Sequence, residues 1–478
     1  MAEEMEERAS GDVVSDKTVS PEPEPAPVKV PDVELVVDGF GFMPKSPDGS
    51  GSNLRPRKLS KGSKETQSPD TRGSPCMSST NIDIVRRFTW KTKNRMTVQV
   101  ITYGATITSI QVPDKKGVPD DITAGFDTLE EYFQPRNPYF GATIGRCANY
   151  VRGAAMSVRP AGRVYMLSAN RGRDHFNGGF VGFDKVNWRS HVVGNKVYMS
   201  HVSERLHEGY PGTLMTQLCF EVTCDNTIHI EMKCTTTEPT VVNLSNAQFF
   251  NLAGHHNGSE SMYEHIVTIN ADKYTQVDDE GLVTGEKKVV GGTAYDFRVP
   301  RCLKAMLPKI PMGGYDVNFC ITQGTAQDLT FHARALHPGT GRVLEVYSNQ
   351  PGMQFYTGNR LPDPEKIVEP LPGALNADEE DGIEQGESEG SELREEDDGE
   401  NGDEASGAGS EGVEQYGYVP LTGKGGTLYK KHGLFCLLPQ NYPDAINHKN
   451  FPNSVLNPGE VYVHKIQYKF GILLGKYV

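Results

Sequence analysis

TIHIEMKC, residues 227–234, alternates apolar and polar side chains with a period of two residues. One side of an extended chain carries Ile228, Ile230, Met232 and Cys234, and the other side carries His229, Glu231 and Lys233. Successive side chains of a β-strand point to opposite faces of a sheet. The stretch therefore predicts a strand that is buried on one face and exposed to water on the other.

The same signal recurs along most of the chain. KIQYKF at 465–470 alternates in the same way, and MTVQVITYGATITSIQV at 96–112 is rich in β-branched residues, which favour strands. Turn-forming clusters separate such runs, as at 113–117, 278–281 and 457–460. Outside the polar segments, no stretch of about 12 or more residues has a clear helical period. The pattern predicts a large all-β protein built mainly of antiparallel sheets.

The first part of the chain has a different composition. Residues 1–82 are rich in Pro, Ser, Glu, Lys and Gly and poor in aromatics, which predicts a disordered tail ahead of a domain at 83–478. One apolar island interrupts this tail, VELVVDGFGFMP at 33–44. Two interpretations of the island stay open. It is a chance apolar cluster, or it is a peptide that docks onto a partner or onto the body of the chain itself.

An acidic segment interrupts the domain at about 374–426. Residues 377–415 contain 17 acidic residues and one arginine, Arg394, while the net charge of the whole chain is −14. The rest of the chain is therefore close to neutral. Such a sequence cannot bury enough apolar surface to fold, and a domain tolerates a long insertion because loop-closure costs grow slowly with length. The segment is either a solvated disordered loop or an electrostatic docking arm for a basic protein partner.

Bulk properties exclude several classes of protein. The acidic net charge argues against general nucleic-acid binding, and no run reaches the roughly 18 to 20 apolar residues that cross a membrane. The eight cysteines form no C-x-x-C pair and no Cys/His cluster with zinc-ligand spacing. The opening residues MAEEMEERAS lack the apolar region of a secretory signal. A cytoplasmic or nuclear location is therefore expected.

A candidate pocket follows from VNLSNAQFFNLAG, residues 242–254. Four polar side chains precede two aromatic ones: Asn243, Ser245, Asn246 and Gln248, then Phe249 and Phe250. Small polar residues beside buried aromatics are typical of a loop that lines a pocket. The residue in the middle of the patch is Ala247, which can neither transfer a proton nor bind a metal.

Seven motifs occur in order and together resemble those of the galactose mutarotase, or aldose 1-epimerase, family. They are GRCANY (145–150), GGFVGFDKVNW (178–188), EGYPGTL (208–214), PTVVNLSNAQFFNLAG (239–254), GYDVNF (314–319), QPGMQFYTGN (350–359) and QNYPDAINHKNFPNSVLNPGE (440–460). The resemblance covers roughly residues 85–478 apart from the acidic segment. It implies the family's β-supersandwich of large antiparallel sheets, which agrees with the alternation described above.

The resemblance also implies a reaction that requires no metal or other cofactor. In the family, a carboxylate removes the proton of the anomeric hydroxyl of a free aldose, and an imidazole donates a proton to the ring oxygen. The ring opens and recloses on either face, which interconverts the α and β anomers. The acid and the base must face each other across one sugar ring, each within hydrogen-bond reach of its proton.

Both proton-transfer groups are missing from this chain. The pattern NLSNAQFFNL places Ala247 where the family has its general-acid His, and FCLLPQN places Leu438 where the family has its general-base Glu. Asn177, in FNGG, stands in place of a second substrate-facing His. Tyr150 stands where an Arg usually follows A-N. No catalytic residue is therefore expected, because each positioned acid or base is worth about 10² to 10⁴ in rate.

Other positions of the family's cleft keep polar side chains. Asp316, in GYDVNF, matches a residue that binds sugar hydroxyls in the family, and Asn149 and Gln354 match residues in or near the cleft. Together with Asn177, these residues form the expected sugar-binding set. No metal site is expected.

Three functions remain open, and the sequence favours the first and the third. The first is a non-catalytic mutarotase-like protein whose cleft binds a sugar or a protein. The second is a functional aldose 1-epimerase that acts on galactose or glucose in hexose metabolism with displaced catalytic groups. The third is a scaffold whose acidic segment and tail bind partners. Neither His175 nor Asp444 nor Glu460 is an obvious replacement, and a carboxylate of a disordered loop would be poorly positioned.

Overall fold

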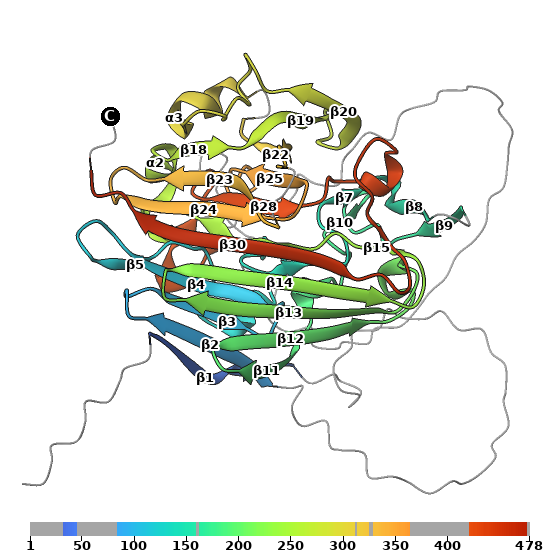
Figure 1. Cartoon of the computed structure of the whole chain (residues 1–478), viewed down its shortest axis with the longest axis horizontal. Coiled ribbons are helices and arrows are strands. Elements are labelled where there is room, and N and C mark those ends of the chain that lie inside the picture. Colours follow the sequence, from blue (N-terminus) through green and yellow to red (C-terminus); the bar gives the residue numbers. More distant parts are fainter. Residues whose placement is uncertain are drawn as a thin grey trace, which may run out of the picture.

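The computed structural model describes residues 32–44, 84–158, 162–310, 313–324, 328–363 and 420–475. Three large sheets of nine, six and five strands dominate these residues (Figure 1). All strand pairs within them are antiparallel. The expectation of an all-β protein with large antiparallel sheets is confirmed.

The nine-stranded sheet crosses the middle of the molecule. Its order is β11 (Arg189–Val193), β12 (Lys196–Ser203), β13 (Leu214–Thr223), β14 (Thr227–Thr236), β30 (Tyr462–Ile472), β24 (Arg342–Ser348), β23 (Thr330–Leu336), β18 (Ile266–Ile269) and β21 (Arg301–Cys302). Strand β14 contains the TIHIEMKC stretch and pairs with both β13 and β30. Ile228 and Met232 are fully buried, whereas Lys233 is exposed, as the alternation predicts.

The six-stranded sheet has one face in the core and one face that is free for a site. Its order is β17 (Phe249–Phe250), β28 (Phe435–Gln440), β25 (Gly352–Tyr356), β22 (Asp316–Ile321), β19 (Ala271–Val277) and β20 (Val283–Val289). Met353, Phe355 and Leu437 pack into the main core. Because side-chain direction alternates along a strand, the residues next to these on β25 and β28 point to the opposite face. That face carries Gln354 and Leu438.

The five-stranded sheet contributes the remaining large layer. Its order is β1 (Val33–Phe42), β2 (Ile84–Thr92), β3 (Thr97–Ile101), β4 (Thr106–Pro113) and β5 (Pro119–Asp121). Trp90 and Ile110 of this sheet join residues of both other sheets in one continuous core. The sheets thus form a single packed body.

Strand β1 corrects the expectation of a tail that is disordered throughout 1–82. The apolar island at 33–44 pairs with β2 along its length, from Val33 opposite Thr92 to Phe42 opposite Ile84. Leu35 packs against the main core, and Phe40 packs against a second apolar cluster beside α1 (Leu129–Tyr132). Of the two interpretations of the island, docking onto the chain's own body is the one found. Asp32, Met43 and Pro44 are also described, whereas the rest of the expected tail, residues 1–31 and 45–82, lies outside the described residues.

Short elements complete the described chain. The two-stranded pairs are β7 (Tyr150–Val151) with β10 (His175–Phe176), β8 (Ala155–Val158) with β9 (Arg163–Met166), β6 (Thr143–Ile144) with β16 (Ser245–Asn246), β15 (Thr240–Val241) with β29 (Val455–Leu456), and β26 (Leu421–Thr422) with β27 (Leu428–Tyr429). Besides α1, the described α-helices are α2 (Gly258–Tyr263) and α3 (Leu303–Met306). All three are short, as expected from the lack of helical periodicity.

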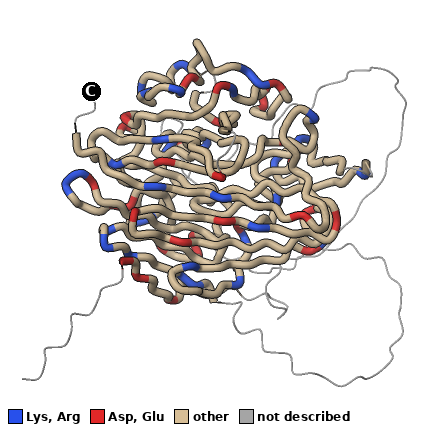
Figure 2. The backbone as a smooth tube through the Cα atoms, in the orientation of Figure 1, with Lys and Arg blue, Asp and Glu red and all other residues tan. Residues whose placement is uncertain are grey.

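Residues 377–415, which carry the charge of the acidic segment, lie outside the described residues. Residues 364–419 lie outside the described part, and so does nearly all of the predicted insertion at 374–426. Its predicted end is wrong by several residues, because β26 begins at Leu421. On the described body, basic and acidic residues are interspersed along the strands (Figure 2). No helix within the described ranges is long and apolar enough to cross a membrane.

The docking of β1 gives a first prediction. Replacing Phe40 by Ala removes a ring whose centroid lies 6.1 Å from that of Tyr132, and should loosen β1 by about 1–2 kcal/mol. Amide hydrogen exchange over residues 33–42 should then become faster. Phe42→Ala is the matched control, because Phe42 is 70% exposed and has little packing to lose. Equal acceleration in both variants would contradict anchoring through Phe40.

Candidate functional site

A cavity of about 420 Å³ opens on the free face of the six-stranded sheet. Three neighbouring strands supply its first wall. Asp316 lies opposite Tyr356 in the β22–β25 pair, and Gln354 lies opposite Leu438 in the β25–β28 pair. Cys436 lies two residues before Leu438 on β28 and points the same way. The pleat of the sheet therefore brings side chains that are far apart in sequence onto one surface.

The second wall comes from the loops around β7 and β10. Asn149 and Asn177 both have positive φ values, 68° and 48°, a backbone region that Asn tolerates better than most residues. The backbone N–H of Asn149 donates to Oδ1 of Asn177 at 2.8 Å. Next to them, the rings of Tyr150 and Phe176 pack with centroids 4.6 Å apart. This wall is aromatic, with polar groups at its edge.

The floor contains the residue that replaces the expected histidine. Ala247 lines the cavity beside Ser245 and Phe249. Its backbone is fixed by two hydrogen bonds, since its N–H donates to the Ala142 carbonyl and its own carbonyl accepts from Gly141 N, each at 2.8 Å. A side chain at position 247 would therefore be held in a defined place.

Most of the polar patch around Ala247 has a structural role instead of facing the cavity. Asn246 is fully buried and donates to the Gly141 carbonyl at 2.9 Å. Oδ1 of Asn243, which is also buried, accepts from the backbone N–H of Asn441 at 2.8 Å. The expectation that this stretch lines a pocket thus holds for Ser245, Ala247 and Phe249, while the amides of Asn243 and Asn246 fix the loop.

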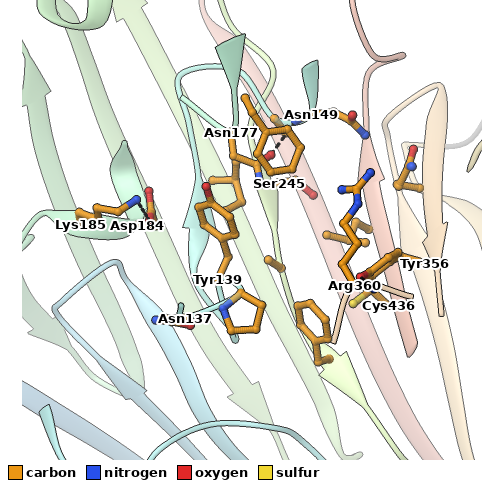
Figure 3. Close-up of a pocket in the computed structure, with 18 of the residues that line it drawn as sticks. Asn137, Tyr139, Asn149, Asn177, Asp184, Lys185, Ser245, Tyr356, Arg360 and Cys436 are labelled. Carbon is orange, nitrogen blue, oxygen red and sulfur yellow. Dashed lines mark hydrogen bonds and ion pairs between the residues drawn. The ribbon is translucent and has the colours of Figure 1, made fainter. Parts of the chain in front are cut away.

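Asp316 is fully engaged within the cavity. Nε2 of Gln354 donates to its Oδ1 at 2.7 Å, and Nη2 of Arg360 lies 3.1 Å from its Oδ2. Burial works against the charge of Arg360, but the nearby Asp316 carboxylate and Tyr150 hydroxyl raise the pKa of the guanidinium above its usual range. Figure 3 shows Arg360 extending from beside Tyr356 along the cavity toward Asn149.

A second ion pair lies at another side of the cavity (Figure 3). Nζ of Lys185 is 2.7 Å from Oδ2 of Asp184 and 5.1 Å from the centre of the Tyr139 ring. The carboxylate of Asp184 is almost completely buried, and this burial raises its pKa despite the adjacent ammonium group. Asp184 is therefore easier to protonate than an ordinary aspartate.

Burial also affects the pKa values of the cysteine and three tyrosines of the lining. Burial raises the pKa of the Cys436 thiol well above its usual value, so it remains protonated. Burial likewise raises the pKa of Tyr103, Tyr139 and Tyr356. The lining, which consists entirely of described residues, contains neither a histidine nor a glutamate.

The residues considered as replacements do not line this cavity. His175 is fully buried, with Nδ1 2.7 Å from the Ser168 carbonyl and Nε2 2.7 Å from the Tyr210 hydroxyl. Asp444 accepts a hydrogen bond from Asn447 at 2.7 Å, and burial raises its pKa to about 6. Glu460 accepts from the backbone N–H of Asn457 at 3.0 Å. Each therefore has a local structural partner away from the cavity.

The structure brings together every site residue expected from the sequence. Asn149, Asn177, Asp316 and Gln354 all line the cavity, and so do Ala247 and Leu438. Among the described residues, no three His, Cys, Asp or Glu side chains form a potential metal site.

Three cations of the lining were missed by sequence reasoning. They are Arg171, Lys185 and Arg360. Lys185 and Arg360 lie within quoted motifs or directly after them, but nothing in the alternation shows which way a loop side chain points.

Comparisons with known proteins agree with this architecture. The family model for aldose 1-epimerase matches residues 86–469. The chain is 36% identical to the galactose mutarotase of Bos taurus over 379 residues, which is 79% of this chain and 92% of that protein. It is 36% identical to the galactose mutarotase of Homo sapiens over 375 residues, 78% of this chain and 91% of that protein.

Solved structures show the same fold. The GalM/aldose epimerase homologue from C. elegans superposes with a TM-score of 0.63 at 23% identity, covering 80% of this chain and 97% of that chain. Galactose 1-epimerase from Lactobacillus acidophilus gives a TM-score of 0.59 at 20% identity, covering 82% and 95%. With the family model, the sequence relatives and the fold in agreement, the chain belongs to the aldose 1-epimerase family.

Proposed function

We propose that this chain is a non-catalytic member of the aldose 1-epimerase family whose cleft binds a ligand without converting it. The observation that carries the proposal is the pair Ala247 and Leu438. Both side chains line the cavity, at the two positions where the family resemblance puts the proton donor and the proton acceptor. A methyl group and an isobutyl group can perform neither role.

The remaining charged groups are poor substitutes. Asp316 is held by Gln354 and Arg360, and Asp184 is held by Lys185. A general base has to reach the anomeric hydroxyl while an acid reaches the ring oxygen of the same sugar. Both carboxylates are instead oriented by these ion pairs, and catalysis depends on how precisely a group is positioned against the reacting atoms.

The cleft nevertheless keeps features of a ligand site. Its size suits a small molecule, and its walls combine aromatic rings with a few fixed polar groups. The rings of Tyr150 and Phe176 offer an apolar surface for the C–H face of a sugar, and Asn177 and Gln354 offer amides for its hydroxyls. These features support retained binding of a sugar-sized molecule.

A functional aldose 1-epimerase is the second candidate, and one observation favours it. Asp184 lies in the lining with a raised pKa, so it could act as a displaced acid–base group. A docking role for the acidic segment with a basic protein partner stays a prediction, as does a cytoplasmic or nuclear location.

The test is anomer exchange of galactose and glucose followed by NMR. The natural chain should not accelerate exchange beyond buffer, because its acid and base positions carry Ala247 and Leu438. Should acceleration appear, the Asp184→Asn variant decides its source. Activity that disappears in this variant would overturn the proposal in favour of a displaced catalytic group at Asp184, and activity that persists would overturn it in favour of another group.

A further inference from the structure

The cleft has an excess of positive charge. Its lining contains three cations, Arg171, Lys185 and Arg360, and two carboxylates, Asp184 and Asp316. Each carboxylate is paired with its own cation, Asp184 with Lys185 and Asp316 with Arg360. Within the described residues, Arg171 forms no ion pair, so one guanidinium charge of the cavity is left without a counter-ion.

Arg171 and Arg360 both approach the Tyr150 side chain. The guanidinium carbon of Arg171 lies 4.9 Å from the centre of the Phe176 ring and 6.0 Å from that of Tyr150. Arg360 interacts with the side chain of Tyr150 as well as with Asp316. Stacking on rings fixes the orientation of a guanidinium while leaving its in-plane N–H donors free.

Arg360 keeps donors available to a ligand. Its side chain is 40% exposed, and only Nη2 is used in the ion pair with Asp316. A guanidinium has five N–H donors, so donors remain beyond those used for Asp316 and Tyr150. Arg360 also occupies one oxygen of Asp316, the residue that the family resemblance assigns to sugar hydroxyls. The same arginine thus weakens a site for a neutral polyol and strengthens a site for an anion.

Leu438 acts in the same direction. The family resemblance puts a glutamate at this position, and an anionic ligand would be repelled by a second negative charge opposite Gln354. With Leu438 in place, the carboxylates of the cavity are limited to the two that are already paired. Having Leu438 in place of the family's catalytic base therefore also removes an electrostatic repulsion of an anionic ligand.

We propose that the cleft is a binding site for a sugar acid, a pyranose-sized ring that carries one carboxylate, with the carboxylate held by Arg171 and Arg360. The single unpaired cation matches a monoanion, and the planar fork of arginine matches a carboxylate. The ring would lie against Phe176 and Tyr150. This inference rests on the proposed function, since it assigns the ligand of a cleft that binds without converting.

The test compares methyl α-galactopyranosiduronate with methyl α-galactopyranoside by calorimetry or ligand-observed NMR on the full chain. Both probes have a locked anomeric centre, so binding is read without any contribution from catalysis. We expect the uronate to bind roughly tenfold more tightly than the neutral glycoside, since charge-assisted hydrogen bonds are the strong ones. The preference should shrink between about 20 and about 300 mM salt as the charges are screened.

Two substitutions locate the site. Arg171→Gln and Arg360→Gln should each remove most of the preference for the uronate, and Arg171, being exposed, can be replaced with little risk to folding. Arg189→Gln is the control, because Arg189 is an exposed arginine on β11 that does not line the cavity. It removes the same charge from the molecule and should leave the preference unchanged.

Several results would overturn the inference. They are equal binding of the two probes, no binding of either, or an equal effect of Arg189→Gln. The phosphate ester of the neutral glycoside is a further arm, and tighter binding of this ester than of the uronate would contradict the assignment to a carboxylate. If the uronate inference is wrong, the result of the anomer-exchange experiment still stands. The ligand assignment and the lack of catalysis are therefore tested separately.

Discussion

Introducing the acid and the base that the family resemblance puts at positions 247 and 438 should convert the natural chain into a mutarotase. In the double variant Ala247→His/Leu438→Glu, we expect anomer exchange of galactose to exceed that of the natural chain by at least about 10²-fold, the lower value typical of positioned acid–base groups. Position 247 has a fixed backbone on the floor of the cavity, and position 438 lies on β28 opposite Gln354. The two new side chains would enter the same cavity from different elements.

The expected gain depends on both groups acting together. Either single variant supplies only an acid or only a base, and catalytic groups that act as a unit are far from additive. Each single variant should therefore remain close to the natural chain. The sharpest control is Ala247→His/Leu438→Gln, which has nearly the same shape as the restored variant but lacks the carboxylate.

A double variant that does not accelerate anomer exchange is informative if its fold is intact. Circular dichroism and thermal unfolding establish the fold, and binding of the methyl galactoside establishes whether the sugar still enters. A folded variant that binds the glycoside but does not accelerate exchange would show that the cavity no longer holds a sugar between positions 247 and 438. The claim that only proton-transfer groups were lost would then be wrong.

Arg360 suggests how such a failure could arise and be relieved. Arg360, which is paired with Asp316, lines the same cavity as the new glutamate at position 438. A carboxylate beside a cation has a lowered pKa and is a weaker base. Adding Arg360→Gln to the double variant should therefore increase the rate further. The same substitution should remove most of the preference for the uronate in the natural chain.

The fold class could be predicted from short-range patterns, because the alternation of apolar and polar residues within a strand identifies its buried face. Ile228 and Met232 are fully buried on β14, as alternation alone indicates. The position of β1 could not be derived in this way. Its ten residues, Val33–Phe42, carry a strand-like composition, but the partner β2 begins only at Ile84, across a polar segment. Pairing over such a separation depends on a free sheet edge, which no local pattern reveals.

The site was predictable where it depends on motifs and unpredictable where it depends on side-chain direction. Asp316 and Gln354 could be placed in one cleft because their motifs resemble those of a family, and the sheet register explains why they meet. Arg171 has no such motif, and its position over Phe176 depends on how a loop folds back. The charge of the cleft, and with it the proposed class of ligand, could therefore be recognised only from the structure.

Acid should unfold this protein well before its carboxylates are fully protonated, because three histidines are completely buried. His265, His332 and His464 have no exposed surface, and burial lowers the pKa of each to about 3. At His265 the neutral form is built into the hydrogen bonding. The backbone N–H of Leu252 donates to Nε2 at 2.9 Å, and Nδ1 lies 3.0 Å from the Met262 carbonyl.

The direction of the effect follows from proton uptake. In the unfolded chain these imidazoles titrate at about 6.5, so below that pH the unfolded state binds protons that the folded state excludes. Stability is therefore retained above about pH 6.5 and lost as the pH falls toward 3. Asp444 partly opposes the loss, since its raised pKa of about 6 lets the folded state take up one proton in the same range.

For these four groups together, the free energy of unfolding should fall by about 4 kcal/mol between pH 6.5 and pH 5, a large share of the 5–15 kcal/mol typical of folded proteins. Urea unfolding at a series of pH values measures the slope. His332→Leu should reduce that slope by up to one proton whatever it does to stability at neutral pH. His191→Gln, at an exposed position on β11, should leave it unchanged. A flat profile down to pH 5 would show that the buried imidazoles can be protonated in place, and would contradict their role as neutral core residues.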